Sequence, residues 1–281
     1  RSTTKFNYEV SANISQIKNN LETLGVPGAT DIYNSNYKNV YVGRTSVGQP
    51  IGHFYVLKAL GIFQTQDEIN SYTDKSGNLI QPNAVPGDEK FLDANGDGVI
   101  NAKDRINAGN SFPVYTYSFN ASASYGGFDF SMLWVGSQGN EIFNGLRLGG
   151  MFMQGLAYNN SPEILNRWTP DNKGGTVPRV TLSDLNNNKV YSTLYIEDGS
   201  FLRMKYLTFG YTFNSKTIGH VITKLRVFVT LQNLITVTGY KGFDPEIGAD
   251  VGANSYNNMY GVDRGVYPQA KSYILGVNLN F

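Results

Sequence analysis

The chain of 281 residues has no cysteine, two histidines and few charged residues. Without cysteine there is no disulfide framework, thiolate nucleophile or cysteine-bound zinc. Charged residues make up 16% of the sequence, and the formal net charge of +1 offers no basic surface of the kind that binds nucleic acids. Disordered chains are poor in aromatic residues, whereas 13% of this chain is aromatic. We therefore expect a folded protein with no nucleic-acid partner.

The sequence also lacks any run of about 18 apolar residues, so no transmembrane helix is predicted. Its first residues, RSTTKFNYEV, contain no charged segment followed by an apolar stretch and no initiator methionine. No signal peptide is expected there, and the chain need not begin where its gene begins. The excess of glycine, with 31 residues, and tyrosine, with 19, is shared by soluble all-β proteins and outer-membrane barrels.

Apolar residues recur at every second position in many segments, which is the periodicity of β-strands. After Gly126-Gly127, a tight hairpin signal, Phe128, Phe130, Met132 and Trp134 fall on one face. The predicted strands are Phe6–Ile14, His53–Gln64, Pro113–Tyr125, Phe128–Val135, Phe201–Phe213, Leu225–Leu231 and Ser272–Phe281. One short helix is expected at Ser161–Trp168, with Ser161 as its N-cap.

An apolar face opposite a polar face fits either a soluble sandwich or a membrane barrel. Two features favour the barrel. The strands are long, at about 10 to 13 residues, where membrane strands need about 9 to 11. Short turns, at Gly126-Gly127 and Asn214–Thr223, alternate with long connections at Thr65–Phe112, Gly136–Val190 and Thr236–Ala270. Short periplasmic turns and long extracellular loops are typical of outer-membrane barrels.

The sharpest local motif is DANGDGVINAKD, residues 93 to 104, which matches a calcium-binding loop. Gly98 takes the sixth position, where the turn needs a positive φ. The expected oxygen ligands are Asp93, Asn95, Asp97, the Val99 carbonyl and, with a shorter arm than the usual glutamate, Asp104. The alternative is an Asx-rich turn that needs no metal. A bound calcium ion would be structural and would rigidify a long loop.

No catalytic constellation is found, so the protein is not expected to be an enzyme. His53 and His220 lack any triad or metal-site context. Asp244 and Glu246, two residues apart beside a proline, are more simply a turn than a glycosidase pair. Several loop aromatics offer stacking surfaces for sugars, although packing of the loops is the simpler expectation: Trp168, Tyr158, Tyr240, Tyr256 and Tyr260.

The last residues, Ile274 to Phe281, form an alternating strand that ends in phenylalanine, which fits an outer-membrane assembly signal. Together with other segments, this strand resembles the C-terminal part of SusC/RagA-type TonB-dependent transporters of Bacteroidetes outer membranes. The segments that carry the resemblance are GQPIGHFYVLKALGIFQTQDEI, PGDEKFLDANGDGVINAKDR, GGFDFSMLWVGSQGNEIFN, YIEDGSFLRMKYLTFGYTF and LRVFVTLQNLITVTGYKGFDPEIG.

The resemblance implies an all-β fold, in which residues 1–281 supply the C-terminal strands of a large antiparallel transmembrane barrel of about 22 strands. The plug domain and the TonB box would lie outside this chain. The implied function is outer-membrane import of large nutrients, either oligosaccharides or peptides. The implied partners are the rest of the barrel and plug, a SusD-like surface lipoprotein, TonB, and outer-membrane lipid.

Two alternatives remain open at this point. One is a soluble secreted calcium-binding β-sandwich, either an adhesin or a carbohydrate-binding module. The other is a small, self-contained eight-strand barrel, which would need an even number of strands and no partner chain.

Overall fold

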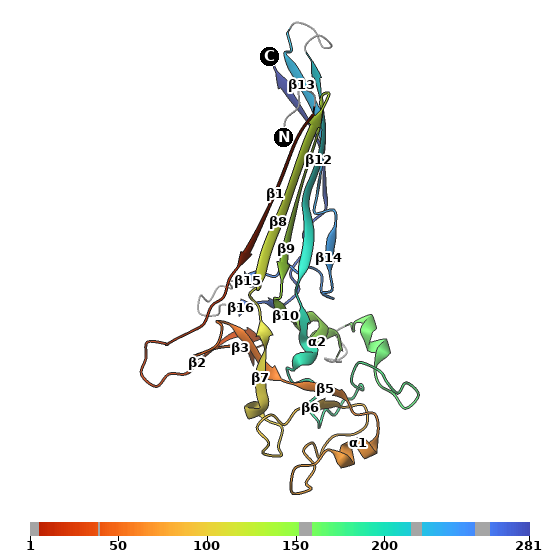
Figure 1. Cartoon of the computed structure of the whole chain (residues 1–281). Coiled ribbons are helices and arrows are strands. Elements are labelled where there is room, and N and C mark those ends of the chain that lie inside the picture. Colours follow the sequence, from red (N-terminus) through yellow and green to blue (C-terminus); the bar gives the residue numbers. More distant parts are fainter. Residues whose placement is uncertain (1–5, 39, 152–158, 215–220, 251–258) are drawn as a thin grey trace.

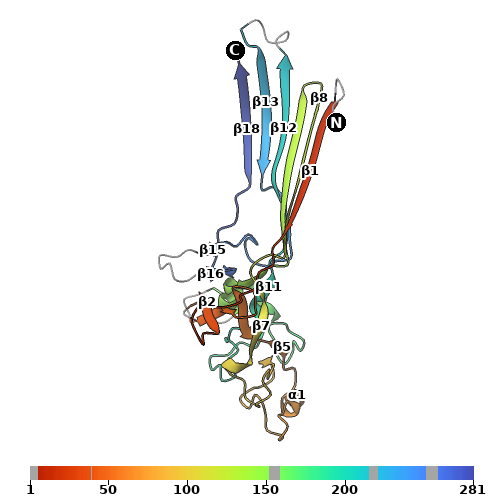
Figure 2. The ribbon, with the colours of Figure 1, turned by 60° about the vertical axis from the view of Figure 1, so that its left-hand side comes forward.

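The computed structural model describes residues 6–38, 40–151, 159–214, 221–250 and 259–281 (Figure 1). Its main feature is one long antiparallel sheet that extends from a smaller folded module (Figures 1 and 2). In sheet order the strands are β1 (Phe6–Gln16), β8 (Tyr115–Tyr125), β9 (Phe128–Gln138), β12 (Phe201–Asn214), β13 (Lys224–Gln232) and β18 (Ser272–Asn280), with β14 (Thr236–Thr238) also paired to β12.

One face of the long sheet is apolar along its whole width. The register sets apolar side chains opposite one another in successive strands, for example Tyr8, Ala123, Phe130, Phe209, Val229 and Leu275. The rings of Phe130 and Phe209 lie 5.1 Å apart between centroids. Nevertheless, Phe209 is 48% exposed and Leu275 78% exposed. An apolar face of this extent is suited to lipid contact rather than to water.

The opposite face of the sheet carries small polar residues and an ion pair. The Thr208 and Thr230 hydroxyls lie 2.8 Å apart across β12 and β13. The Arg226 guanidinium pairs with the Asp129 carboxylate at 2.5 Å. This division into an apolar face and a polar face is the pattern expected for a barrel wall between lipid and lumen.

Nothing in the described residues covers either face of β1, since all eleven of its residues are exposed. A sandwich would bury one face of each strand against a second sheet, so the sandwich alternative is wrong. Among the described strands, β1 pairs only with β8 and β18 only with β13, which leaves the sheet open at both edges. The sheet is therefore a segment of a barrel wall rather than a closed eight-strand barrel.

The smaller module is built from the connections between the long strands. It contains a four-stranded sheet in the order β2 (Asp31–Tyr37), β3 (Val40–Ser46), β4 (His53–Leu57) and β7 (Arg105–Asn110). The smaller sheets consist of β5 (Ala59–Ile62) with β6 (Glu89–Phe91), β10 (Glu141–Asn144) with β11 (Ile196–Asp198) and β17 (Val262–Asp263), and β15 (Ala249–Asp250) with β16 (Met259–Tyr260).

The helices of this module are short. They are α1 (Gln66–Ser71), α2 (Gly145–Met151) and the 3₁₀ turns Ala102–Asp104, Pro162–Asn166 and Thr193–Tyr195. Among the residues that the structure describes, no helix has both the length and the apolar character needed to cross a bilayer.

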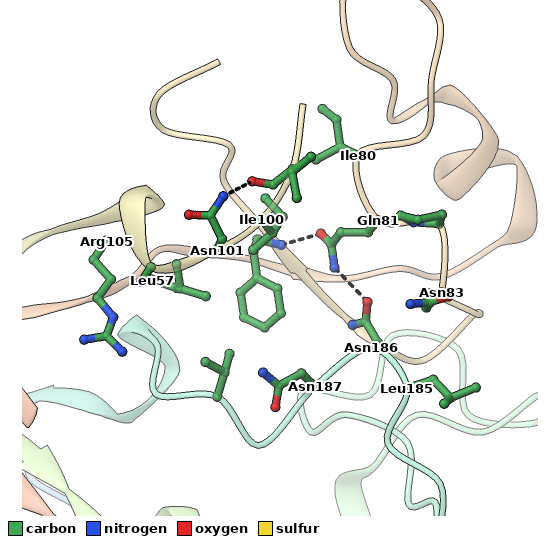
Figure 3. Close-up of a pocket in the computed structure, with 15 residues that line it drawn as sticks. Leu57, Ile80, Gln81, Asn83, Ile100, Asn101, Arg105, Leu185, Asn186 and Asn187 are labelled. Carbon is green, nitrogen blue, oxygen red and sulfur yellow. Dashed lines mark hydrogen bonds between the residues drawn. The ribbon is translucent and has the colours of Figure 1, made fainter. Parts of the chain in front are cut away.

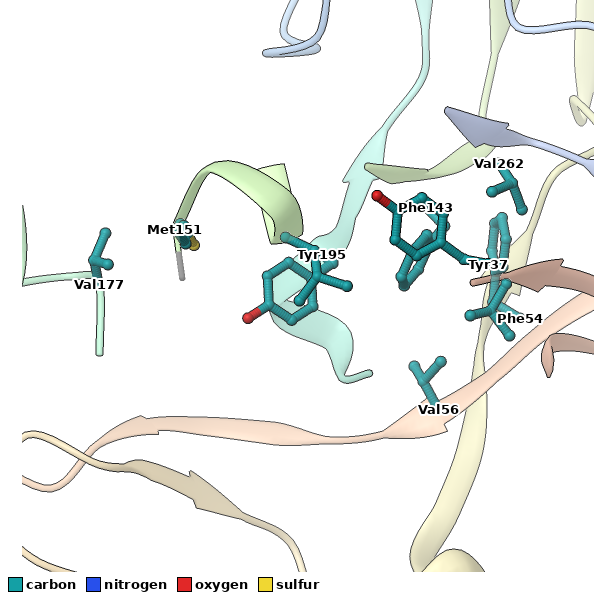
Figure 4. Packing of buried hydrophobic residues seen from close by; sticks show 10 residues of the cluster. Tyr37, Phe54, Val56, Phe143, Met151, Val177, Tyr195 and Val262 are labelled. Carbon is teal, nitrogen blue, oxygen red and sulfur yellow. The ribbon is translucent and has the colours of Figure 1, made fainter. Parts of the chain in front are cut away.

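The hydrophobic core of the chain lies in this module rather than in the long sheet (Figure 4). Tyr37, Phe54, Phe143 and Tyr195 pack together with smaller apolar side chains from β3, β4, α2, β17 and the loop residue Val177. The Tyr37 hydroxyl donates to the Gly145 carbonyl at 2.7 Å, which joins β2 to α2. The connections between long strands are thus a folded unit with its own core, and not a set of separate loops.

Most of the predicted strands are confirmed, as is the tight turn at Gly126-Gly127. Two predictions are corrected. The expected strand His53–Gln64 is broken at Lys58 into β4 and β5, which pair with different neighbours, β4 with β3 and β7 and β5 with β6. The expected helix at Ser161–Trp168 is only a 3₁₀ turn over Pro162–Asn166, although Ser161 does cap it by accepting from the Glu163 amide.

Candidate calcium loop and adjoining pocket

The loop from Asp93 to Asp104 gathers three of its predicted ligands. One carboxylate oxygen from each of Asp93, Asp97 and Asp104 lies within 4.8 Å of the other two. Asp104 is fully buried, whereas Asp97 is exposed. Hard cations such as calcium bind at about 2.4 Å from carboxylate and carbonyl oxygens, so the donor set fits a calcium ion.

Hydrogen bonds within the loop fix the position of these carboxylates. Asp93 accepts from the amides of Gly96 and Gly98, both at 2.8 Å. Asp104 accepts from the amides of Ala94 and Asn101, at 3.0 and 2.7 Å. A carboxylate has about four lone-pair sites, so these bonds leave each group able to bind a cation.

The other two predicted ligands take part in the same network. The Asn95 side-chain oxygen accepts from the Asp97 amide at 2.9 Å. The Val99 carbonyl accepts from the Asn101 side chain at 3.0 Å. These bonds are those of a series of Asx turns, which the metal-free alternative also requires. The geometry is therefore compatible with both hypotheses, and calcium binding stays a prediction.

Gly98 is required at its position for two reasons. Its φ of +83° lies in the left-handed region that favours glycine. A Cβ there would also lie 3.0 Å from a carboxylate oxygen of Asp74, which belongs to the turn after α1. The Asp74 carboxylate accepts from the amides of Ser76 and Asn78, and these bonds lower its pKa below the ordinary value. The candidate calcium loop thus packs directly against a second ordered turn.

A pocket of about 370 Å³ lies beside the calcium loop (Figure 3). One wall is formed by residues 99–102 of the loop itself, and the facing walls come from residues 80–83, residues 185–187 and Val190. Leu57 and the buried ring of Phe91 complete the lining. No acidic residue lines the pocket within the described part of the chain, and its one charged lining residue is Arg105.

Side-chain amides hold the walls of the pocket together. Gln81 donates to the Asn186 side chain at 2.9 Å and accepts from the Phe91 amide at 2.8 Å (Figure 3). Gln81 and Asn186 also both donate to the backbone carbonyl of Glu89, at 3.0 and 2.9 Å. Segments about a hundred residues apart in the sequence are therefore joined by one amide network.

The Glu89 side chain is a buried acid next to this network. It is 1% exposed, and its Oε1 accepts from the Ser192 hydroxyl at 2.7 Å. Burial raises the pKa of Glu89 to about 8, because removal from water disfavours the charged form. Two side-chain oxygen atoms, Oε2 of Glu89 and the hydroxyl oxygen of Tyr195, are also buried. The charge of Arg147 acts against this shift of the Glu89 pKa, and Arg147 itself pairs with Glu163 at 2.7 Å.

The other residues considered from the sequence have structural roles. His53 is fully buried in β4 with its Nδ1 3.2 Å from the Pro50 carbonyl, and burial lowers its pKa. Asp244 and Glu246 both accept from Arg203, at 2.6 and 2.7 Å, so they form an ion-pair network rather than a catalytic pair.

The loop aromatics that the structure describes pack within the module, as expected. The Tyr240 hydroxyl donates to the Asp263 carboxylate at 2.6 Å, and the Tyr260 ring lies 5.0 Å from the Phe112 ring. The Trp168 ring packs closely on Gly87. A Cβ atom at position 87 would lie 2.5 Å from the Trp168 ring. Tyr158, Tyr256 and His220 lie outside the described residues.

The pocket could not be predicted from the sequence. The Asn186–Asn188 run and the Gln81-Pro82-Asn83 turn are its only local signals, and they read as ordinary loop sequence. Asparagine is common in turns because its side chain bonds to nearby backbone. The pocket depends on contacts across about a hundred residues, which no local pattern reveals.

No family model matches the chain. Two curated proteins of Formosa agariphila, TonB-dependent receptors P3 and P26, are each 31% identical to it over 98% and 99% of its length. TonB-dependent receptor SusC of Bacteroides thetaiotaomicron is 26% identical over 99% of the chain. Among solved structures, the RagAB peptide transporter matches the whole chain at 27% identity with a TM-score of 0.73. The chain spans only about a quarter of these proteins, 25 to 28% of their lengths.

The open sheet with one apolar face and these similarities together define part of a TonB-dependent outer-membrane β-barrel. Within that class, the chain corresponds to part of a transporter of the SusC/RagA type. The long sheet therefore lies in the outer membrane, and the folded module belongs to the long extracellular connections of the barrel.

Proposed function

We propose that the chain is part of an importer that takes large nutrients, oligosaccharides or peptides, across the outer membrane. The similarity over nearly the whole chain to TonB-dependent receptors supports this most directly. One structural neighbour is described as a peptide transporter and another as a peptide importer. The two open sheet edges support pairing with the remaining strands of the same barrel.

In this proposal the chain performs no covalent chemistry. The long sheet supplies barrel wall, and the folded module contributes to the extracellular mouth. A SusD-like lipoprotein would cover that mouth, and TonB would act on a plug domain supplied by another part of the transporter. The rigid core around Phe143 and Tyr195 would hold the mouth in a defined shape while a ligand is enclosed.

Energised uptake tests the proposal. The full-length gene would be deleted in the source bacterium, and uptake of a labelled protein digest and a labelled oligosaccharide mixture would be followed. Uptake of one ligand class should be lost, should return on complementation, and should stop when a protonophore collapses the membrane potential. Uptake that persists in the deletion strain, or that resists the protonophore, would contradict the proposal.

We propose further that residues 93–104 bind a structural calcium ion through Asp93, Asn95, Asp97, the Val99 carbonyl and Asp104. The convergence of three carboxylates supports this, because calcium would remove their mutual repulsion. Such an ion would stiffen the loop and the wall of the neighbouring pocket.

Hydrogen exchange of the EGTA-treated full transporter, with and without added calcium, tests this site. Asp97→Asn is the best variant, since asparagine keeps an oxygen for the Val99 amide but loses the charge. Calcium should slow exchange of residues 93–104 in the wild type and in Asp171→Asn, an exposed control, but not in Asp97→Asn. Exchange that does not respond to calcium in the wild type would favour the metal-free Asx turn.

A further inference from the structure

The pocket beside the calcium loop has a lining that selects among ligands. Its apolar lining is almost entirely aliphatic, with Leu57, Ile80, Ile100 and Val190 around the cavity. The one aromatic lining residue, Phe91, is 1% exposed and offers no flat face to a sugar ring. Sugar recognition commonly uses an exposed aromatic face, whereas aliphatic walls suit an apolar side chain.

Polar groups in the pocket point to a ligand with peptide-like hydrogen bonding. The lining contains five side-chain amides: Gln81, Asn83, Asn101, Asn186 and Asn187. Each amide has both donor and acceptor atoms, which matches the alternating N–H and C=O groups of a peptide. Gln81 and Asn186 are bound to each other and to the backbone, so they form a fixed wall rather than mobile side chains.

The charge in the pocket is positive and lies at one end of the cavity. Arg105 lies at one end of the cavity, and Leu185 and Asn83 lie at the other (Figure 3). Within the described residues, the Arg105 guanidinium makes no ion pair, and no carboxylate is present in the lining. A partly shielded guanidinium beside an apolar cavity favours a carboxylate, which it can bind through two parallel hydrogen bonds.

We propose that this pocket binds the carboxylate-terminated apolar end of a peptide, with the carboxylate on Arg105 and an aliphatic side chain in the cavity. This inference rests on the proposed import function and narrows its substrate class to peptides. The volume of about 370 Å³ accommodates one or two residues and not a long chain. The remainder of a longer peptide would extend out of the pocket.

Isothermal titration on the full transporter purified in detergent tests the site. The probes are N-acetyl-leucyl-leucine with a free carboxylate, the same peptide as its C-terminal amide, and maltotriose as the sugar probe. In the wild type the free acid should bind at least tenfold more tightly than the amide, the usual range for a charge-assisted pair. Arg105→Gln should weaken the free acid about tenfold and leave the amide unchanged.

Two further variants locate the effect. Lys103→Gln removes a positive charge two residues away that does not line the pocket, and it should leave both peptides unaffected. Asn83→Trp fills the end of the cavity opposite Arg105 and should abolish binding of both peptides. Native hydrogen exchange of the barrel strands confirms that each variant is folded.

Three results would each overturn the proposal. The first is equal affinity of the wild type for the free acid and the amide, and the second is a loss of free-acid affinity in Lys103→Gln equal to that in Arg105→Gln. The third is binding of maltotriose to the wild type that is lost in Asn83→Trp. Titration measures binding without transport. A transporter that binds the peptide acid but fails the uptake assay would therefore refute import alone, and the reverse result would refute this pocket alone.

Discussion

Replacement of Glu89 by glutamine should stabilise the extracellular module at alkaline pH. Glutamine has the shape and hydrogen-bonding groups of the protonated acid, and its oxygen can still accept from the Ser192 hydroxyl. It carries no charge, so it avoids the cost of an ionised group in a fully buried site. This stabilisation should grow with pH, because residue 89 can ionise in the wild type but not in the variant.

The pKa of Glu89 sets the size of this effect. Its value is raised from 4.5 to about 8 in the folded state. Below pH 4.5 both the folded and unfolded chains hold the proton, and the acid causes no pH dependence. Between pH 4.5 and 8 the unfolded chain loses its proton while the folded chain keeps it, so stability falls as pH rises. At about 1.36 kcal/mol per unit, the loss is about 3 kcal/mol at pH 7 and about 5 kcal/mol above pH 8.

Hydrogen exchange of the full transporter is the suitable assay, since the barrel would dominate a global melting curve. The amides of Phe63 and Leu92 donate to the carbonyls of Asp88 and Lys58, so they report on opening around Glu89. At pH 7, after correction for the intrinsic rate, exchange there should be about three hundredfold slower in Glu89→Gln than in the wild type, because pH 7 lies 2.5 units above the ordinary pKa of 4.5.

Glu22→Gln, which alters an exposed acid, provides the control and should leave these rates unchanged. Faster exchange in Glu89→Gln than in the wild type at pH 7, or the same pH dependence of exchange in both proteins, would refute a raised pKa for Glu89. Either result would mean that the Glu89 carboxylate is ionised in the folded state and stabilised by the charge of Arg147.

Two other substitutions test the loop and the ion-pair network. Gly98→Ala should destabilise the loop of residues 93–104 by about 1–2 kcal/mol more than Gly96→Ala, measured by local hydrogen exchange, because both glycines have positive φ but only a Cβ at position 98 would meet Asp74. Arg203→Met should cost about 3–5 kcal/mol, because Asp244 would be left as an unpaired buried carboxylate. Faster proteolysis of the segment after β14 would report this loss, and unchanged proteolysis would contradict it.

The long strands were predictable because each one repeats the same two-sided environment along its length. In Phe128–Gln138 the residues Phe128 to Met132 alternate between the apolar and the polar side of the sheet, and Trp134 continues the apolar face, although Leu133 and Val135 interrupt the alternation on the other face. The barrel class, the hairpin at Gly126-Gly127 and the outer-membrane location all follow from this regularity and from the resemblance that the segments carry.

The extracellular module was far less predictable, because its short strands are partly buried on both faces. In β4, His53, Phe54, Val56 and Leu57 are all buried, so no alternation separates β4 from β5. The break at Lys58 is decided by tertiary partners, since the Leu57 and Ala59 amides donate to Tyr191 and Thr193. Contacts across more than a hundred residues cannot be read from a local pattern.

The position of the core in the module has a functional consequence. A barrel wall gains its stability from lipid and from neighbouring strands, and it needs no core of its own. The module is bound to that wall at the ends of the long strands and is rigidified by side chains such as Phe143 and Tyr195. A pocket on such a module keeps its shape when lining residues change, because Gln81 and Asn186 fix its walls through backbone carbonyls. Substitutions at Arg105 should therefore alter which ligand binds without altering the barrel.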